Sequence, residues 1–361
     1  MKIAFRVDAS LEMGAGHVMR CLTLADKLKQ IGYSCSFISR QQPGELTELI
    51  KQRQHVVYRL PECVEPTDQH LVHSNWLKGG QKRDAEEGAE VLQKIQPDWL
   101  VVDHYGIDKA WEQTVRHYVK HILVIDDLAD REHDCDILLD QNLGQTREVY
   151  QALLPESCKV LAGCDYTLLR PEFLDYRERS LEYRRKQKNI NRLLITMGGV
   201  DKDNYTEKAL TALELSQLPE STEVLVVLGN GAPWLTNIKE QAKSSRLKVG
   251  VANNIQNMAE RMANTDLAIG AAGSTSWERC CLGLPSIMCV IADNQRVVAK
   301  ALNSAGAAIL ANGADVTKSI QQQTDQLLQN FDRLTELSQA AAKLVDGKGT
   351  DRVVQAMQAR V

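Results

Sequence analysis

A histidine flanked by glycines stands near the start of the chain, in the stretch MGAGHVMRC at residues 13–21. The apolar run KIAFRVDAS precedes it and predicts a first β-strand. Gly14 and Gly16 would let the backbone turn tightly into a helix, whose positive end and free amides suit an anion. His17 at that helix start is a candidate general base, because imidazole titrates near neutral pH. Spacing alone equally fits His17 as a helix cap, since G-x-G without a third glycine is a weak motif.

A second stretch, AIGAAGSTSWERCC at residues 268–281, has a similar arrangement. The pattern predicts a strand that ends at Gly270, a loop of small residues, and a helix that begins near Ser274. The loop and the helix start would expose amides and a hydroxyl to a phosphate. Glu278 lies one turn into the helix, where its carboxylate suits a bidentate hydrogen bond to two ribose hydroxyls. The alternative is that Glu278 only complements the helix dipole.

Two further predicted strands also end in groups that could act on a ligand. The run WLVVD ends in Asp103 and continues with His104 and Tyr105, which would orient a water or a sugar, or else only hold the end of the strand. In MGGVDKDN, Gly198 and Gly199 again loosen a turn from a strand into a helix, close to where a diphosphate could bind. Both groups therefore join the candidate site.

Acidic and amide side chains complete the set of candidates. Asp201 or Asn204 would cap the helix after MGGVDKDN or reach a diphosphate, and capping is the expected role of Asn204. The segment DDLADREHDCD, residues 126–136, has the composition of a hard-cation site. Its carboxylates are spread along what reads as a solvated, turn-forming loop. We therefore expect no metal there.

Composition excludes several classes of partner. The chain has 361 residues, a net charge of -4 and no dense Lys/Arg block, which argues against nucleic acid and anionic membranes. The main apolar run, residues 280–292, is shorter than a membrane span, and the first residues lack a signal-peptide pattern, so a cytoplasmic protein is expected. Nine scattered cysteines without C-x-x-C spacing fit reduced thiols. All eight histidines lie at or before His133, so any histidine chemistry belongs to the first half.

These candidates need a framework of strands that alternate with helices. Expected strands lie at residues 2–8, 33–38, 99–103, 122–126, 137–139, 159–161, 192–197, 223–228, 247–251, 266–270 and 286–291. Expected helices lie between them at residues 18–31, 83–95, 108–118, 204–215, 234–244, 257–263 and 274–282. Near-continuous apolar strands indicate parallel sheets covered on both faces.

The fold class expected is α/β, with two facing Rossmann-like, doubly wound domains and a ligand cleft between them. The N-terminal domain would span residues 1–174 and the C-terminal domain residues 192–361. The charged, poorly periodic stretch at residues 175–191 is the expected linker. Helices after Val316 would either close the second domain or cross back onto the first.

Three segments together carry a family resemblance: RVDASLEMGAGHVMRCLTLADKL, ITMGGVDKDN and NIQNMAERMANTDLAIGAAGSTSWERCCLGLP. They closely resemble the UDP-sugar hydrolases of pseudaminic acid biosynthesis, which release UDP from UDP-2,4-diacetamido-2,4,6-trideoxy-β-L-altropyranose. The second half also looks like the MurG-like glycosyltransferases that add N-acetylglucosamine to lipid I. The resemblance to both families implies the GT-B fold of two facing Rossmann-like domains. The resemblance covers residues 1 to about 310 and is weaker between residues 55 and 98.

The resemblance assigns roles to individual positions. It implies that Glu278 binds the ribose, that Gly273 and Ser274 approach the diphosphate, and that Ile255 meets the uracil through its backbone. The catalytic histidine of the family falls on His17. Such a reaction needs a positioned water, a base to take its proton and stabilisation of the departing diphosphate. One imidazole and two amide-rich loops are sufficient for these tasks.

The expected activity is therefore that of an inverting, metal-independent UDP-sugar hydrolase without a cofactor. Its one expected partner is the UDP-sugar substrate, and a monomer is expected. Arg170, in DYTLLRPEF, would pair with a phosphate or a sugar substituent as the family pattern suggests, or else form a hinge ion pair. Two other functions stay open. One is a glycosyltransferase of the same fold with a sugar or lipid acceptor, and the other is a UDP-sugar-binding protein without catalysis.

Overall fold

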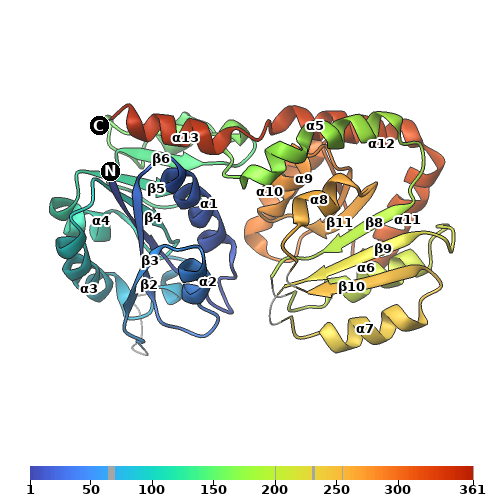
Figure 1. Ribbon diagram of the computed structural model, residues 1–361, viewed down its shortest axis with the longest axis horizontal. Helices are drawn as coiled ribbons and strands as arrows, with labels where there is room; N and C mark the ends of the chain where they lie inside the picture. Colours follow the sequence, from blue (N-terminus) through green and yellow to red (C-terminus); the bar gives the residue numbers. More distant parts are fainter. Residues whose placement is uncertain (64–69, 200, 230–231, 254, 361) are drawn as a thin grey trace. The chain divides into compact units, whose positions relative to one another are not determined.

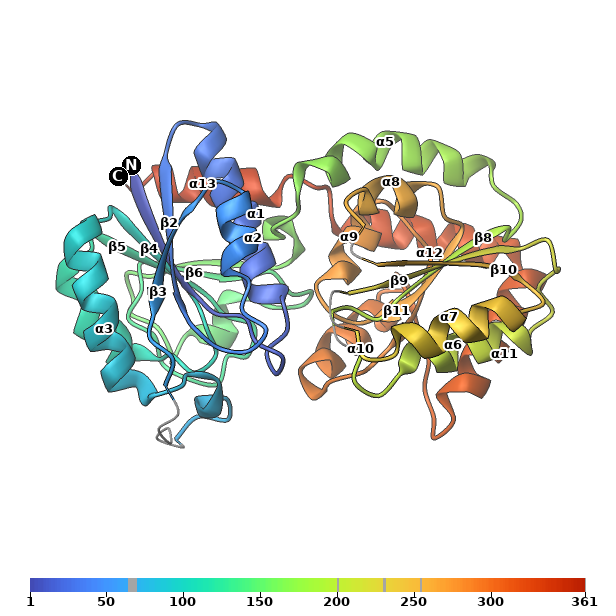
Figure 2. The same cartoon turned by 60° about the horizontal axis from the view of Figure 1, so that its bottom comes forward.

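The computed structural model describes residues 1–63, 70–199, 201–229, 232–253 and 255–360. Contacts divide the chain into two compact α/β units, which Figures 1 and 2 show from two directions. Unit 1 comprises Met1–Leu168 together with Gly349–Val361, and unit 2 comprises Leu169–Lys348. Each unit has a parallel sheet with helices packed on it.

Unit 1 contains a seven-stranded sheet with the strand order β3-β2-β1-β4-β5-β6-β7. Neighbouring strands pair in parallel throughout. The strands are β1 (Lys2–Val7), β2 (Ser34–Arg40), β3 (Val56–Leu60), β4 (Trp99–Asp103), β5 (His121–Ile125), β6 (Ile137–Asp140) and β7 (Lys159–Ala162). The helices are α1 (Gly16–Gln30), α2 (Thr47–Gln52), α3 (Gly80–Ile95), α4 (Lys109–Val115) and α13 (Gly349–Gln358), with short 3-10 turns that include η1 (Ser74–Trp76).

Helices cover both faces of this sheet, because successive strand residues point to opposite sides. On β1, Ile3 and Phe5 join a core that also contains Leu24 of α1 and Met357 of α13. Ala4 joins a second core on the other face, with α3 and α4. Helices therefore bury both faces of this sheet, as the near-continuous apolar strands predict.

Unit 2 contains a six-stranded sheet with the order β10-β9-β8-β11-β12-β13, also parallel. Its strands are β8 (Arg192–Thr196), β9 (Glu223–Leu228), β10 (Lys248–Asn253), β11 (Leu267–Ala271), β12 (Ser286–Cys289) and β13 (Ile309–Leu310). Its helices are α5 (Pro171–Lys186), α6 (Tyr205–Glu214), α7 (Leu235–Ser244), α8 (Met258–Ala263), α9 (Thr275–Cys281), α10 (Arg296–Ser304), α11 (Val316–Gln329) and α12 (Phe331–Leu344). Figure 2 shows α5 and α8 on one side of this sheet and α6, α7 and α11 on the other.

The predicted linker at residues 175–191 is wrong for most of its length, because Pro171–Lys186 is the helix α5 of unit 2. The sequence of α5 lacks a regular apolar stripe, because polar side chains hold this helix against the rest of unit 2. Ser180 Oγ and Arg184 Nε both donate to the Leu282 carbonyl, at 2.7 and 3.0 Å. The contact boundary falls at residues 168 and 169, and α13 belongs to unit 1. The units therefore differ from the predicted ranges 1–174 and 192–361.

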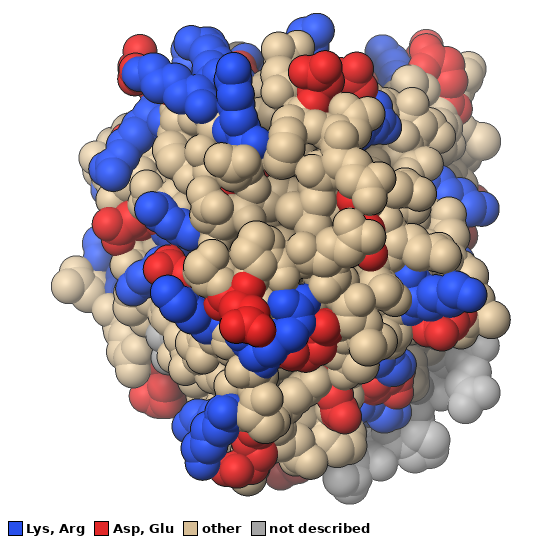
Figure 3. Space-filling view, turned by 90° about the vertical axis from the view of Figure 1, so that its right-hand side faces the viewer, with Lys and Arg blue, Asp and Glu red and all other residues tan. Residues whose placement is uncertain are grey.

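Charged side chains of both signs mix on the face of unit 2 shown in Figure 3, where groups of Lys and Arg are interrupted by Asp and Glu. Within the described part of the chain, no helix combines the length and the apolar character needed to cross a bilayer. All nine cysteines are free and buried.

Candidate active site

The loop between β1 and α1 is closed by its own hydrogen bonds. Ser10 Oγ accepts from the Met13 amide at 3.0 Å, and the Ser10 carbonyl accepts from the Gly14 amide at 2.8 Å. Gly14 has a φ of +76°, a backbone conformation that residues other than glycine rarely adopt. Gly16 is the first residue of α1 and has an ordinary φ. At both glycines the space that a Cβ would fill is open, so the backbone is accessible there.

His17 lies in the first turn of α1 and points at the end of β4. Its Nδ1 is 2.6 Å from Asp103 Oδ1, with the imidazole 6% exposed and the carboxylate fully buried. Because a carboxylate only accepts, Nδ1 carries the hydrogen, and Nε2 is the ring atom able to take a proton. His17 does not cap the helix: the N-cap residue is Ala15, and no side chain caps this end.

Arg20 fixes the other side of the Asp103 carboxylate. Its Nε is 2.6 Å from Oδ2 and its Nη2 is 2.7 Å from Oδ1, while Nη1 pairs with Asp127. Burial opposes ionisation of Asp103, but the Arg20 guanidinium and His17 outweigh it and hold the pKa of that carboxyl well below its usual range. The Asp103 carboxylate is therefore charged at neutral pH.

Tyr105 joins the same network from the loop after β4. Its hydroxyl donates to Asp127 Oδ2 at 2.6 Å, and its ring meets the His17 ring edge-on with centroids 4.6 Å apart. Burial and the Asp127 carboxylate raise the pKa of Tyr105 well above its ordinary value, so the phenol keeps its proton. Trp76 stacks on Tyr105 at 5.6 Å and meets His17 edge-on at 6.1 Å, which gives the imidazole an aromatic wall.

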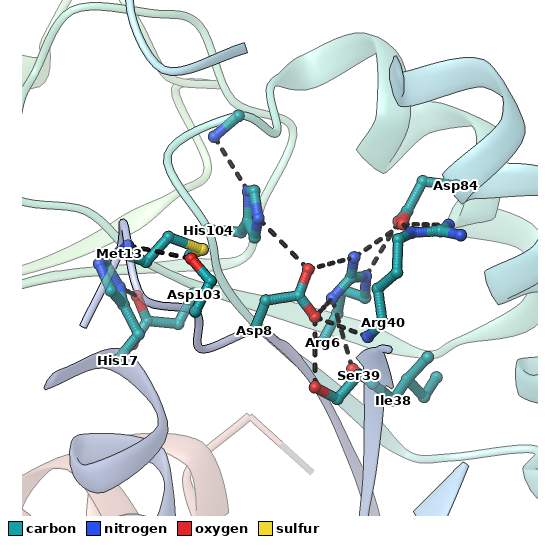
Figure 4. A network of polar contacts seen from close by, with 12 residues as sticks. Arg6, Asp8, Met13, His17, Ile38, Ser39, Arg40, Asp84, Asp103 and His104 are labelled. Atoms are coloured by element: carbon teal, nitrogen blue, oxygen red, sulfur yellow. Dashed lines mark hydrogen bonds and ion pairs between the residues drawn. The ribbon is translucent and has the colours of Figure 1, made fainter. Parts of the chain in front are cut away.

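His104 serves a different, structural network, which Figure 4 shows beside His17 and Asp103. Its Nδ1 accepts from the Gly106 amide at 3.0 Å, and its Nε2 is 3.4 Å from Asp8 Oδ2. Asp8 in turn binds Arg6, which also pairs with Asp84 at 2.7 Å. These groups are fully or almost fully buried. Of the three residues predicted at the end of β4, Asp103 and Tyr105 therefore contact His17, and His104 holds the sheet edge.

A second group of predicted residues gathers in unit 2, at the end of β11. Gly273 and Ser274 precede α9, and Ser274 is exposed and makes no cap through its side chain. Glu278 Oε1 lies 3.4 Å from Arg170 Nη2, while Arg170 Nη1 pairs with Glu172 at 2.9 Å. Burial raises the pKa of Glu278, and Arg170 partly opposes this. Arg170 therefore pairs with two carboxylates of its own unit.

Gly198, Gly199 and Ile255 follow the carboxyl ends of β8 and β10 in the same unit. Gly198 has a φ of +88°. Gly199 lies against Gly229, because a Cβ on Gly229 would stand 2.2 Å from the Gly199 carbonyl oxygen. The sequence analysis does not single out Gly229. Ile255 is half-buried in the loop before α8. No contact joins these three residues to Glu278 among the hydrogen bonds and ion pairs of the described residues.

Capping occupies both polar residues of the MGGVDKDN turn. Asn204 caps α6 as predicted, because its side chain accepts from the Glu207 amide. Asp201 accepts from the amides of Tyr205 and Thr206, at 2.8 and 2.9 Å. These contacts use the same carboxylate and amide oxygens that would otherwise face a ligand.

In the acidic segment at residues 126–136, carboxylates form ion pairs with arginines. Asp126 pairs with Arg131 at 2.8 Å, and Asp136 pairs with Arg116 at 2.7 Å. The described ranges contain no group of three or more His, Cys, Asp or Glu side chains arranged to hold a metal ion.

Sequence reasoning missed Arg20, Asp127 and Trp76. Arg20 had a usable signal, because residues three apart share a helix face and Arg20 follows His17 at that spacing. Asp127 follows the predicted strand at residues 122–126, at the sheet edge that also holds Asp103, but its position in the acidic segment 126–136 hides this role. Trp76 lies in a segment without clear periodicity, and nothing in its neighbours placed it beside His17.

Residues 192–353 match the model of the glycosyltransferase family 28 C-terminal domain. An uncharacterised protein of Methanocaldococcus jannaschii is 29% identical over 80% of this chain, but the match spans only 55% of that relative's length. The UDP-2,4-diacetamido-2,4,6-trideoxy-β-L-altropyranose hydrolase of Campylobacter jejuni is 28% identical over 76% of this chain and 86% of its own.

Among solved structures, the MurG of Acinetobacter baumannii is similar with a TM-score of 0.71 and 17% identity, over 99% of both chains. At that identity the likeness concerns the fold. The protein is thus a distant relative of the Campylobacter hydrolase, and it has the GT-B fold of two Rossmann-like domains with parallel sheets.

Proposed function

We propose that this protein is an enzyme that hydrolyses a UDP-sugar and releases UDP. The observation that carries the proposal is the set His17, Asp103 and Arg20, in which a buried carboxylate orients an imidazole at a helix start. A protein that only bound a UDP-sugar would need no such oriented base. The distant relationship to the Campylobacter hydrolase supports the same activity.

The proposed reaction is attack of water on the anomeric carbon. His17 Nε2 takes the proton as the water oxygen bonds to that carbon, and the bond from the carbon to the diphosphate oxygen breaks with inversion. Asp103 stabilises the imidazolium that forms, because it stays ionised and accepts from Nδ1. The leaving group is UDP, whose charge the loop amides of unit 2 stabilise.

The residues of unit 2 are proposed to hold the nucleotide. Glu278 would bind the ribose hydroxyls in place of its contact with Arg170, whose Nη2 lies 3.4 Å from Glu278 Oε1. Gly273 and Ser274 would approach the diphosphate, with Gly198 and Gly199 beside it, and Ile255 would meet the uracil. The sugar proposed is a 2,4-diacetamido-2,4,6-trideoxy sugar, after the substrate in the name of the Campylobacter relative.

A glycosyltransferase is the second candidate, because residues 192–353 match a glycosyltransferase domain. Such an enzyme would pass the sugar to a sugar or lipid acceptor in place of water. UDP release measured with and without added acceptor separates the two functions. The hydrolase releases UDP at the same rate in both cases, whereas a transferase needs the acceptor and a binding protein releases no UDP in either case.

A further inference from the structure

A buried guanidinium without a carboxylate partner among the described residues lies at the carboxyl end of β11 in unit 2. Arg279, on α9, is only 1% exposed. Its Nη2 donates to the Ala271 carbonyl at 2.8 Å and to Ser276 Oγ at 2.9 Å. Its Nη1 is buried and has no hydrogen-bond partner among the described residues, and within those residues Arg279 makes no ion pair. One side of the guanidinium therefore lacks an acceptor.

The unpartnered Nη1 of Arg279 lies next to Gly270. A Cβ on Gly270 would stand 2.3 Å from Arg279 Nη1 and 2.7 Å from the Thr196 carbonyl oxygen. Gly270 and Thr196 face each other across β11 and β8, near the carboxyl ends of both strands. The loop with Gly198 and Gly199 follows β8, and the loop with Gly273 follows β11. The guanidinium thus lies at the base of both loops.

The charge of Arg279 is costly where it stands. An arginine keeps its proton at any ordinary pH, and a buried charge loses hydration that only an opposite charge or hydrogen-bond acceptors can replace. Burial lowers the pKa of Arg279, and the nearby Glu278 carboxylate offsets this only in part. Arg184, the other buried arginine of this unit, donates to the carbonyls of Leu282, Thr265 and Met262. Arg279 differs from Arg184, because its Nη1 has no hydrogen-bond acceptor among the described residues.

We propose that Arg279 is a positioning residue that holds the two loops in shape and supplies them with positive charge for the diphosphate of the bound nucleotide. The inference rests on the proposed function, since it takes the diphosphate to bind at these loops. A diphosphate anion there would supply the opposite charge that this buried cation lacks. The same field would favour UDP as a leaving group.

The test compares two ligands that differ only in the diphosphate. Affinities of UDP and uridine are measured by calorimetry and ligand-observed NMR for the wild type, Arg279→Met, Arg279→Gln and Arg279→Lys. The neutral variants should weaken UDP by about tenfold or more, the range for a lost charged contact, and leave uridine within about twofold. Arg279→Lys should recover part of the UDP affinity. Arg279→Gln, which can still donate to the Ala271 carbonyl, separates charge from loop shape.

Arg184→Met is the matched control, because it also removes a buried guanidinium from unit 2 and should change UDP and uridine affinity equally. Equal loss of both ligands in the Arg279 variants, or no loss of either, would overturn the inference. The proposed function would survive that result if the wild type still binds UDP and releases it from a UDP-sugar. A wild type that does neither would overturn the proposed function instead.

Discussion

His17 owes its orientation to a carboxylate that is far from it in the sequence. Asp103 ends β4, Arg20 lies one turn further along α1, and Asp127 follows β5, yet the four form one continuous chain of hydrogen bonds. Each contact fixes the next, so the imidazole has one orientation and one tautomer. In the proposed mechanism, activity therefore depends on the pair of His17 and Asp103 rather than on His17 alone.

Replacing the base should separate chemistry from binding. We expect His17→Leu to lower turnover of the UDP-sugar by about 100-fold or more, the range for a lost general base, while UDP affinity stays nearly unchanged. Asp103→Asn should lower turnover too, because an amide in place of the carboxylate no longer favours the same tautomer. Steady-state kinetics with calorimetry of UDP measure both effects. Near-normal turnover of His17→Leu would remove the base from the mechanism.

Glu278 should govern recognition of the ribose. We expect Glu278→Ala to weaken UDP binding by about 1.5–3 kcal/mol, the range for hydrogen bonds to a charged group. The wild type should bind 2′-deoxy-UDP poorly, and the variant should bind it almost as well as UDP. Calorimetry of both nucleotides with both proteins decides the matter. If wild type and variant discriminate equally between the two nucleotides, Glu278 does not contact the ribose.

The sequence predicts which residues lie near the candidate site, but not which side chains they contact. His17, Asp103 and Tyr105 could be placed together, because strand ends and helix starts meet at the carboxyl edge of a parallel sheet. That His104, between two of these residues, turns away to Asp8 could not be predicted, since it depends on which side of the loop each side chain takes. The pairing of Arg170 with Glu278 depends in the same way on side-chain reach.

The turn from β1 into α1 is the element on which the site depends. Its two glycines differ in what the backbone requires of them, since only Gly14 has a positive φ. Gly14→Ala should therefore destabilise the folded protein by about 1–2 kcal/mol, the cost of a left-handed residue with a Cβ, and should lower turnover. Gly16→Ala is the matched control and should leave stability within about 0.5 kcal/mol. Denaturant unfolding and turnover are measured on both; equal effects would contradict this account.

Elements with a clear apolar period were predictable, and those held by polar contacts were not. The buried strands β4, β9 and β11 were each predicted to within a residue or two, because uninterrupted apolar runs bounded by turn residues identify covered parallel strands. The edge strand β3 is half exposed, and β13 has only two residues, so neither stands out. The sequence predicts a linker where α5 lies, because hydrogen bonds from Arg184 and Ser180 to a backbone carbonyl hold this helix in place of an apolar stripe.

At the scale of the whole molecule, the sequence indicated two α/β units but not the path of the chain between them. The last helix, α13, belongs to unit 1, where Asp351 pairs with Lys27 of α1 at 2.5 Å. Such a return depends on packing between segments that are more than 300 residues apart. Periodicity within a segment carries no information on which distant surface the segment will cover.

Buried carboxyls should make the stability of the folded protein depend on pH. Burial, with the Asp127 carboxylate beside it, raises the pKa of Asp140 to about 7, and Tyr150 donates to it at 2.8 Å. A folded-state pKa above the unfolded value means that the folded state binds the proton more tightly. The free energy of unfolding should therefore decrease as pH rises from about 4 to 7, by up to about 1.4 kcal/mol per pH unit from this group.

Asp140→Asn should remove that contribution. Relative to the wild type, the variant should gain stability as pH rises from about 4 to about 7, because only the wild type loses this contribution over that range. Urea unfolding of both proteins at several pH values measures the difference. Parallel curves for the two proteins would show that Asp140 does not titrate in this range.

Attack of water on the anomeric carbon is the central claim, and isotope labelling tests it most directly. The enzyme is incubated with UDP-2,4-diacetamido-2,4,6-trideoxy-β-L-altropyranose in ¹⁸O-labelled water without any acceptor, and the released UDP is analysed by mass spectrometry. The account predicts UDP release without ¹⁸O in the UDP, because the bond between carbon and oxygen breaks. Label in the UDP, which would mean attack at phosphorus, or no release without an acceptor would contradict it.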